Sequence, residues 1–271
     1  MNRLLAGVAL LAATIAVTAP ARAGNIFLTG HDTDFHMFAG SASAKAAMIA
    51  DLAYVRNGST LPVLVLDANG GGFGLELDAD LTALGVAHTT IDPNGTLTAS
   101  MFNPLVYSAI AVASMVNCGG CDLTASALAN IATQSAAIAS FFNAGGGILG
   151  FSGADYANAY DYVPQAAANA GGSPPAFNFV ETAAGTAAGL VAENGDPTHN
   201  YFGTPGVGGL SASYQVAETN GGNNESLFLT NGTISCDVTN TCTITDVPEP
   251  ASMLILGASL LGLGAVRRRR G

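Results

Sequence analysis

The sequence predicts an α/β domain in which a parallel sheet carries helices on both faces, followed by a β-rich C-terminal extension. Short apolar runs alternate with helix-length amphipathic segments over the first half of the 271-residue chain, a pattern typical of parallel sheets covered on both faces. Nearly half of the residues are hydrophobic and 10% are charged, which favours a packed core over disorder. Between residues 233 and 245, alternating Thr, Ile and Val around a polar turn indicate a β-hairpin.

Each expected strand is a short apolar run, and the continuous run over 62–66 is of the type buried on both faces. The expected helices are amphipathic; an Asn-Gly pair at 57–58 ends the first and three glycines at 145–147 end the last. We expect strands over 26–29, 62–66, 87–91, 108–113 and 148–151, and helices over 42–56, 75–84 and 124–144.

The N-terminus has the three parts of a secretory signal peptide. Arg3 gives a positive start, an apolar stretch covers 4–17, and Ala21 and Ala23 supply the small side chains that signal peptidase requires. We expect cleavage after Ala23, which leaves Gly24 as the mature N-terminus.

The C-terminus joins a proline-flanked acid to an apolar run and a basic end. The prolines keep the backbone around the acid extended, so that a processing enzyme can reach it. The apolar run predicts a single hydrophobic helix that just reaches across a bilayer, and the arginines hold its end in the cytoplasm. The parts are, in order, Val247, Pro248, Glu249 and Pro250, the apolar run 252–266, and Arg267, Arg268, Arg269 and Arg270.

This order of parts over residues 247–271 resembles the PEP-CTERM sorting signal of Gram-negative bacteria. The resemblance implies transient anchoring in the inner membrane after signal peptidase has acted, recognition by an exosortase, and release to the cell surface or into an exopolysaccharide matrix. The same tail module is also labelled an ice-binding protein C-terminal domain, a label that implies nothing about ice. A plain single-pass anchor is the alternative, and whether the tail is cleaved or retained stays open.

Beyond Tyr162 the alternation of strands and helices weakens. Residues 166–176 are rich in Ala, Gly and Pro and are expected to form a surface loop. The segment 177–245 is expected to be β-rich, with one of its better strands at 227–229. The predicted organisation is therefore a signal peptide (1–23), an α/β domain (24–165), a β-rich extension (166–246) and a sorting signal (247–271).

Charge is distributed unevenly between the ends and the body. Six of the eight basic residues lie in the two ends, which leaves Lys45 and Arg56 for the body. All nineteen acids lie between Asp32 and Glu249. Such an acidic body repels phosphate backbones, which argues against nucleic-acid binding; divalent cations and basic or neutral partners stay open.

The four cysteines form two local pairs, as expected for disulfides in an exported chain. Cys236 and Cys242 flank the polar turn of the predicted hairpin and are expected to close it. Cys118 and Cys121 lie between a strand and a helix, where we expect a second structural disulfide. A redox pair and a zinc site shared with the other two cysteines are the alternatives.

A second resemblance covers roughly residues 25–165. It rests on the segments 26–32, 108–113 and 141–153, of which the last is the strongest, because a helix there ends in glycines before a short strand and a tight turn. This order is similar to the class I glutamine amidotransferase-like fold, a flavodoxin-like α/β family that includes ThuA-like proteins. The resemblance implies a flavodoxin-like sheet and transfers no activity by itself.

In that family the turn after this strand holds a cysteine nucleophile, and Ser152 stands at the matching position. Its small neighbours permit the sharp turn of a nucleophile elbow. A serine nucleophile also needs a histidine base and an orienting acid. His199 is the candidate base, although the His-x-Glu pairing of the family is absent, and we favour a structural turn.

The segment after the first strand groups four potential metal ligands. His31, Asp32, Asp34 and His36 offer imidazole and carboxylate, the ligand types of zinc, manganese and iron. They follow the carboxyl end of a parallel strand, where ligands bind in this class of fold. A divalent metal is thus left open as a cofactor, and a turn with helix-capping aspartates is the alternative. The glycine-rich segment 69–74 lacks the Lys-Ser/Thr of a P-loop and is interpreted as a flexible loop.

These patterns favour a non-catalytic surface or matrix protein. The competing hypothesis is an extracellular hydrolase or metal-dependent enzyme acting on glycan or peptide, and it requires His31, His36, Ser152 and His199 to gather in one cleft. A sugar-binding module is a third hypothesis, weakened by the absence of tryptophan.

Overall fold

The computed structural model describes residues 23–246 apart from 116–118, 153–155, 157, 167, 170–176, 196–199, 231 and 238–240. Four features that the sequence predicts fall outside the described residues. They are residues 1–22 of the signal peptide with Ala21, the cysteine Cys118, the candidate base His199 and the sorting signal 247–271.

One half of the central sheet is parallel, as the sequence predicts. Its five strands pair in one direction and their apolar side chains are buried on both faces, except in the outermost strand, where the side chains are partly exposed. Each of these strands matches an expected apolar run within one or two residues. In spatial order they are β3 (His88–Ile91), β2 (Val63–Leu66), β4 (Ala109–Val112), β5 (Gly147–Gly150) and β1 (Asn25–Thr29).

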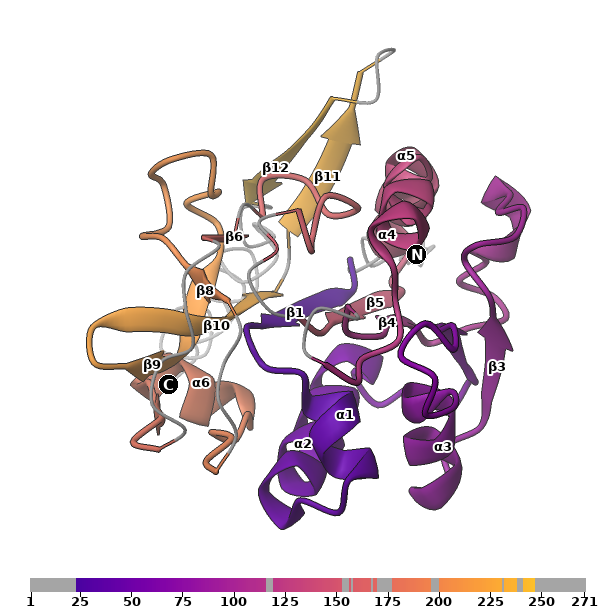
Figure 1. The fold of residues 1–271 in the computed structure, drawn as a ribbon. Helices are drawn as coiled ribbons and strands as arrows, with labels where there is room; N and C mark the ends of the chain where they lie inside the picture. The colour runs from indigo at the N-terminus through magenta and orange to yellow at the C-terminus, as the bar shows by residue number, and fades with distance from the viewer. Residues whose placement is uncertain are drawn as a thin grey trace, which may run out of the picture.

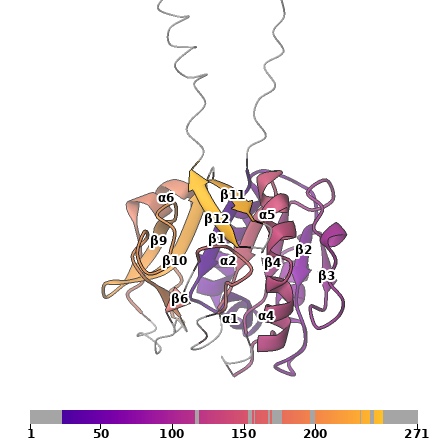
Figure 2. The same ribbon diagram turned by 90° about the horizontal axis from the view of Figure 1, so that it is seen from above.

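The other half of the sheet is antiparallel and comes from the β-rich extension. Its longest strand, β10 (Asn223–Thr230), pairs with the whole length of β1. Figure 2 shows β9 and β10 on one side of β1 and β4, β2 and β3 on the other. The remaining strands are β6 (Ala168–Asn169), β7 (Val180–Glu181), β8 (Tyr201–Phe202) and β9 (Gln215–Asn220), which complete a ten-stranded mixed sheet within the described residues.

The strand order corrects the expectation of a flavodoxin-like parallel sheet. In that fold the first strand lies between the second and third, whereas here β1 lies between β5 and β10. The extension therefore continues the sheet, because β10 supplies hydrogen bonds to the free edge of β1 from residue 25 to residue 29. Strand pairing across some two hundred residues leaves no local signal in the sequence. The flavodoxin-like strand order is wrong, whereas the β-rich extension that the sequence predicts is present and extends the sheet.

Helices cover both faces of the parallel half, as expected. Figure 1 shows α1, α2 and α3 on one side of β1, β4 and β5, and α4 and α5 on the other. The helices are α1 (Thr33–Phe38), α2 (Ala42–Arg56), α3 (Glu76–Ala83), α4 (Ala125–Ala132), α5 (Ser135–Asn143) and α6 (Ala183–Ala188), with a short 3₁₀ turn η1 (Ala99–Met101).

The single helix expected over 124–144 is two helices with a break at Thr133 and Gln134. The hydroxyl of Thr133 donates to the carbonyl of Asn130 over 2.6 Å, and the hydroxyl of Ser135 donates to the carbonyl of Ala132 over 2.5 Å. Hydroxyl side chains that bond to nearby carbonyls compete with the helical backbone pattern. The apolar periodicity passes through the break, which is why it could not reveal it.

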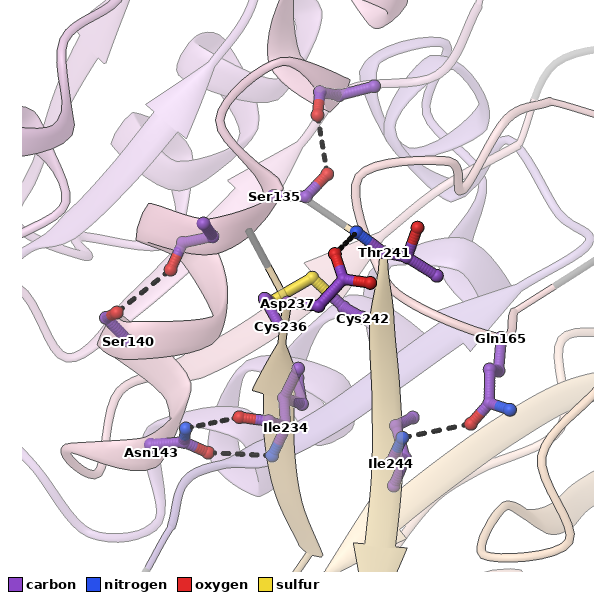
Figure 3. Close-up of a disulfide and its surroundings, with 12 residues drawn as sticks. Ser135, Ser140, Asn143, Gln165, Ile234, Cys236, Asp237, Thr241, Cys242 and Ile244 are labelled. Atoms are coloured by element: carbon purple, nitrogen blue, oxygen red, sulfur yellow. Dashed lines mark hydrogen bonds between the residues drawn. A yellow bond between two sulfur atoms is a disulfide. The ribbon is translucent and has the colours of Figure 1, made fainter. Parts of the chain in front are cut away.

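The predicted cysteine hairpin is confirmed. Strands β11 (Gly232–Cys236) and β12 (Cys242–Asp246) pair antiparallel, and a disulfide joins Cys236 to Cys242. Figure 3 shows how this hairpin is fixed to α5: the side-chain amide of Asn143 donates to the carbonyl of Ile234 over 2.7 Å and accepts from its N–H over 2.9 Å. Cys121 is also disulfide-bonded.

No helix within the described residues is long and apolar enough to cross a membrane. The single hydrophobic helix expected near the C-terminus falls in 252–266, which is outside those residues.

Candidate functional site at the sheet switch point

The parallel half has a topological switch point between β2 and β4. The chain leaves β2 towards β3 on one side and leaves β4 towards β5 on the other. In open α/β sheets, ligands bind in the crevice at the carboxyl ends of the strands at such a point. The segments that follow β2 and β4 are therefore the expected position of a ligand-binding or catalytic site.

Five buried carboxyl groups gather around this point, and we call them the switch-point cluster. Asp67 follows β2 and Asp122 follows the β4 segment, whereas the other three members come from helices on the same side. All five are at most 3% exposed. The members are Asp34 from α1, Asp67, Glu76 and Asp80 from α3, and Asp122.

Asp67 and Asp122 form a carboxyl pair. Burial raises the pKa of Asp67 to about 9, and the hydrogen bond that its carboxyl makes to the Asp122 carboxylate adds to this shift. Burial also raises the pKa of Asp122. Two carboxyl groups in hydrogen-bond contact must share at least one proton, since neither can donate when both are ionised. Asp67 therefore retains its proton at neutral pH.

The other three members have similar surroundings. Desolvation by burial is the largest cause of each shift, and neighbouring carboxylates add to it: the pKa of Asp34 is raised to about 7, and those of Glu76 and Asp80 to about 8. Asp34 accepts a hydrogen bond from the N–H of Ser114 at 2.7 Å. Neither carboxylate oxygen of Glu76 has a hydrogen-bond partner among the described residues.

Basic side chains do not neutralise the cluster. Arg56 bonds the carbonyl of Leu61 and the hydroxyl of Ser108, which precede β2 and β4 at the opposite end of the sheet. Lys45 is exposed on the first turn of α2. Among the described residues, His36 lowers the pKa of Glu76, against the larger opposing effects of burial and the neighbouring carboxylates. Burial without counter-charge favours the neutral acids.

The four predicted metal ligands do not share one centre. Helix α1 begins at Thr33, so His31 lies before the helix and His36 lies within it, and their rings have different partners. The ring of His31 lies 3.1 Å from Glu218 Oε2, whereas the ring of His36 lies 3.6 Å from Asp32 Oδ1. Asp34 belongs to the switch-point cluster. Within the described ranges, no three His, Cys, Asp or Glu side chains are arranged to hold a metal ion. Metal binding by these four residues stays a prediction.

Ser152 is fully buried directly after β5. Its hydroxyl accepts a hydrogen bond from the side-chain amide of Asn200, and its N–H donates to the carbonyl of His31 over 3.0 Å. Its φ is not positive, in contrast to Asn57, Gln165 and Asn178. The described backbone therefore gives Ser152 no sign of the strained elbow that presents a nucleophile. Because His199 lies outside the described residues, a pairing of the two stays a prediction.

A second set of buried polar residues, which we call the glutamate network, lies on the side of β1 that faces the antiparallel strands. Glu218 Oε2 lies 3.1 Å from the ring of His31 and 2.9 Å from the hydroxyl of Ser226, and Glu218 Oε1 accepts from the N–H of Glu193 at 2.9 Å. Glu193 accepts from the hydroxyl of Thr33 at 2.7 Å. Its members are Thr33, His31, Glu193, Glu218 and Ser226.

Sequence reasoning missed both groups of buried acids. One signal was available: Asp67 directly follows the apolar run of β2, and Glu76 and Asp80 are four residues apart, which places both on the buried face of α3. No signal pointed to Glu193 and Glu218, because they reach Thr33 and His31 from 160 and 187 residues further along the chain.

Comparison with known protein families finds a motif at the C-terminal end of the chain. The PEP-CTERM protein-sorting motif matches residues 246–270. No curated protein and no solved structure matches the chain, so the amidotransferase-like resemblance of the body has no support. The motif implies export that depends on an exosortase and localisation at the cell surface or in the extracellular matrix. The chain thus carries a PEP-CTERM sorting signal at its C-terminus.

Proposed function

We propose that this protein is a non-catalytic component of the cell surface or of an exopolysaccharide matrix, sorted there by an exosortase. The observation that carries the proposal is the sorting motif at residues 246–270. The order of events is cleavage by signal peptidase after Ala23, transient anchoring of the tail in the inner membrane, and processing by the exosortase near Glu249. The working form is then the acidic body.

The ends of the folded body support this processing scheme. The N–H of Gly24 donates to the carbonyl of Phe142 over 2.8 Å, and a Cβ at Gly24 would lie 1.9 Å from the carbonyl oxygen of Gly146. The expected mature N-terminus is thus a glycine that fits where a side chain would clash. At the other end β12 finishes at Asp246, where the sorting motif begins. Removal of both ends leaves every described strand and helix intact.

Burial of the candidate groups supports a non-catalytic role. Ser152 and His31 are at most 1% exposed, and so are Asp32 and Asp34. A groove of about 620 Å³ between α2 and α6 is lined by neutral side chains, including Asn25, Tyr54 and Gln215. A catalytic acid or base must reach its substrate, and these buried groups do not.

Replacement of Pro248, Glu249 and Pro250 by alanine tests the proposal in the native bacterium. We expect the altered protein to stay in the membrane fraction with its arginine tail, whereas the unaltered protein is recovered outside the cell with Gly24 as its first residue. Asp161→Asn, an exposed substitution in the body, is the matched control. Fractionation and intact-mass measurement report both results. Equal release of the triple variant, or full-length chain in the cytosol, would contradict the proposal.

One observation favours a second candidate, an extracellular hydrolase. The Asp67–Asp122 pair at the switch point has the residue types of a general acid and base, because a hydrogen bond joins its two carboxyls and burial raises the pKa of Asp67 to about 9. Hydrolysis of matrix glycan or peptide by the purified protein, lost in Asp67→Asn and retained in Asp161→Asn, would favour the enzyme. Absence of any turnover would favour the non-catalytic role.

A further inference from the structure

The segments that precede the parallel strands lie together at one end of the sheet, and we call this surface the amino-end face. The N–H of Val63 donates to the carbonyl of Ala87 over 2.9 Å, and the N–H of Ser108 donates to the carbonyl of Pro62 over 2.8 Å. The parallel direction of the strands thus gathers separate segments on one surface. Before β2, β3, β4 and β5 respectively, these segments are 57–62, 84–87, 102–108 and 144–146.

Both ends of the folded body lie beside the amino-end face. At the first end, the N–H of Gly24 donates to the carbonyl of Phe142, in the last turn of α5. At the other end, Asp246 pairs with Gly232, which closely follows the end of β10, and that end of β10 lies opposite the start of β1. Figure 2 shows the tip of β12 and the end of α5 on the same side of the molecule. The leader and the sorting tail therefore join the body at one end of the sheet.

The stretches that connect the body to the two apolar runs are short. Residues 18–23 separate it from the apolar stretch 4–17, and residues 247–251 separate it from the apolar run 252–266. An extended chain spans at most about 3.5 Å per residue, so neither connection exceeds roughly 20 Å. While either run is in a bilayer, the surface nearest the bilayer is the one beside the two ends of the body. That surface is the amino-end face.

Charge distinguishes the two ends of the sheet. The four amino-end segments contain no Asp or Glu, and Arg56 lies there, bonded to the segments that precede β2 and β4. At the opposite end Asp32 follows β1, Asp67 follows β2 and Asp92 follows β3. Asp246 lies at the exit of the tail, outside the four segments. Because an anionic lipid surface repels acids and attracts Arg, the amino-end face is the end that such a surface can approach.

Apolar side chains are exposed on the same face. Leu105 is 85% exposed, Val106 is 44% exposed and Leu61 is 38% exposed. The hydroxyl of Ser108 donates to the carbonyl of Leu61 over 2.8 Å, which places Leu61 beside the segment that carries the other two. Tyr107 is partly exposed next to them, and tyrosine is enriched at membrane interfaces. Exposed apolar side chains that lie together mark surfaces for a partner or a membrane.

We propose that the amino-end face is the membrane-facing surface of the anchored intermediate, with Leu61, Leu105 and Val106 in contact with the lipid surface of the inner membrane. The acids that follow the strands then point away from the anionic lipids, and the stretch around Glu249 is held at the bilayer surface. This proposal rests on the transient anchoring in the proposed function and adds the orientation of the body.

Because the chain contains no tryptophan, single tryptophan reporters can test this orientation in the full chain, reconstituted into vesicles of phosphatidylethanolamine and phosphatidylglycerol. In L105W the reporter lies on the amino-end face, whereas in F73W it lies at the opposite end, where Phe73 is 60% exposed. When the lipids carry brominated acyl chains, we expect quenching of L105W to exceed that of F73W roughly threefold. If far-UV circular dichroism shows that L105W does not fold, L61W replaces it with the same expected result.

Two valines of similar exposure provide a matched test of the contact. Val106 is 44% exposed on the face, and Val191 is 42% exposed close to Glu193, which bonds Thr33 beyond the carboxyl end of β1. In the L105W background, Val106→Asp should reduce the quenching by about half, because anionic lipid repels the added carboxylate. Val191→Asp should leave the quenching unchanged.

Three outcomes would contradict the proposal, and they can be told apart. Equal quenching of L105W and F73W in chains that float with the vesicles would overturn the membrane-facing surface and leave the sorting route intact. Protection of L105W from iodide without quenching by brominated lipid would also overturn it, because a second copy of the chain would then cover the face. Chains that do not float with the vesicles would refute the anchoring step, and the membrane-facing surface with it.

Discussion

The two buried polar regions on either side of β1 deal with their acids in opposite ways. In the glutamate network, Glu218 is surrounded by an imidazole, a hydroxyl and a backbone N–H within 3.1 Å. In the switch-point cluster, Glu76 has no hydrogen-bond partner among the described residues for either carboxylate oxygen. Buried acids in one molecule therefore differ in their role. Glu218 joins distant segments through hydrogen bonds, whereas burial raises the pKa of Glu76 to about 8.

The largest effect should come from Glu218→Ala. This change leaves His31, Ser226 and the N–H of Glu193 without their shared partner in a buried site, which should lower the free energy of unfolding by about 3 kcal/mol. Urea denaturation measures it, with Glu181→Gln on the neighbouring strand as the control. A loss under about 1 kcal/mol would mean that the network is not the tie between the two halves of the sheet.

A smaller effect of opposite sign should come from Glu76→Met. The apolar side chain has a similar length and removes a carboxyl whose pKa is raised to about 8 by burial. Because the wild-type group opposes folding increasingly above its ordinary value near 4.5, the variant should match the wild type at pH 5. At pH 8 it should be more stable by about 1 kcal/mol, a discounted value because nearby solvent relieves part of the cost of the charge.

Urea denaturation at the two pH values measures the difference, and Asp161→Asn is the control for removal of an acid at an exposed position. Destabilisation of Glu76→Met at both pH values would show that Glu76 has a partner that stabilises the fold. The contrast between the two polar regions would then disappear.

The strands of the parallel half were predictable from the sequence, although the place of β1 beside β5 was not, and neither was the pairing of the antiparallel half. Strands such as 63–66 and 109–112 are continuous apolar runs, and their neighbours in space follow each other closely along the chain. The pairing of β1 with β10 joins residues 25 and 230, and no local pattern encodes it. The hairpin was predictable because its two strands and its disulfide lie within fifteen residues.

The candidate site was predictable only in part. The sequence drew attention to residues 31–36 at the end of β1, and Asp34 does belong to the cluster. The short helix α1 was not expected, and it turns His31 towards Glu218 and away from Asp34. Asp67, Glu76 and Asp122 come from three separate segments that only the folded sheet brings together. Single acids after apolar strands are too common to indicate a site until their convergence is seen.

The smallest effect should come from Ser226→Ala, which removes a neutral hydrogen-bond donor from the glutamate network and leaves its charged residues in place. The hydroxyl of Ser226 lies 2.9 Å from both Glu218 Oε2 and Thr29 Oγ1, so Ser226→Ala removes one hydrogen bond to Glu218 and leaves the other partners in place. We expect a loss of about 1 kcal/mol in the free energy of unfolding. The loss should be the same at pH 5 and pH 8, because a serine hydroxyl does not titrate in this range. A loss that grew with pH would mean that the contribution of the Ser226 hydroxyl is not that of a hydrogen bond alone, and the contrast between the two regions would weaken.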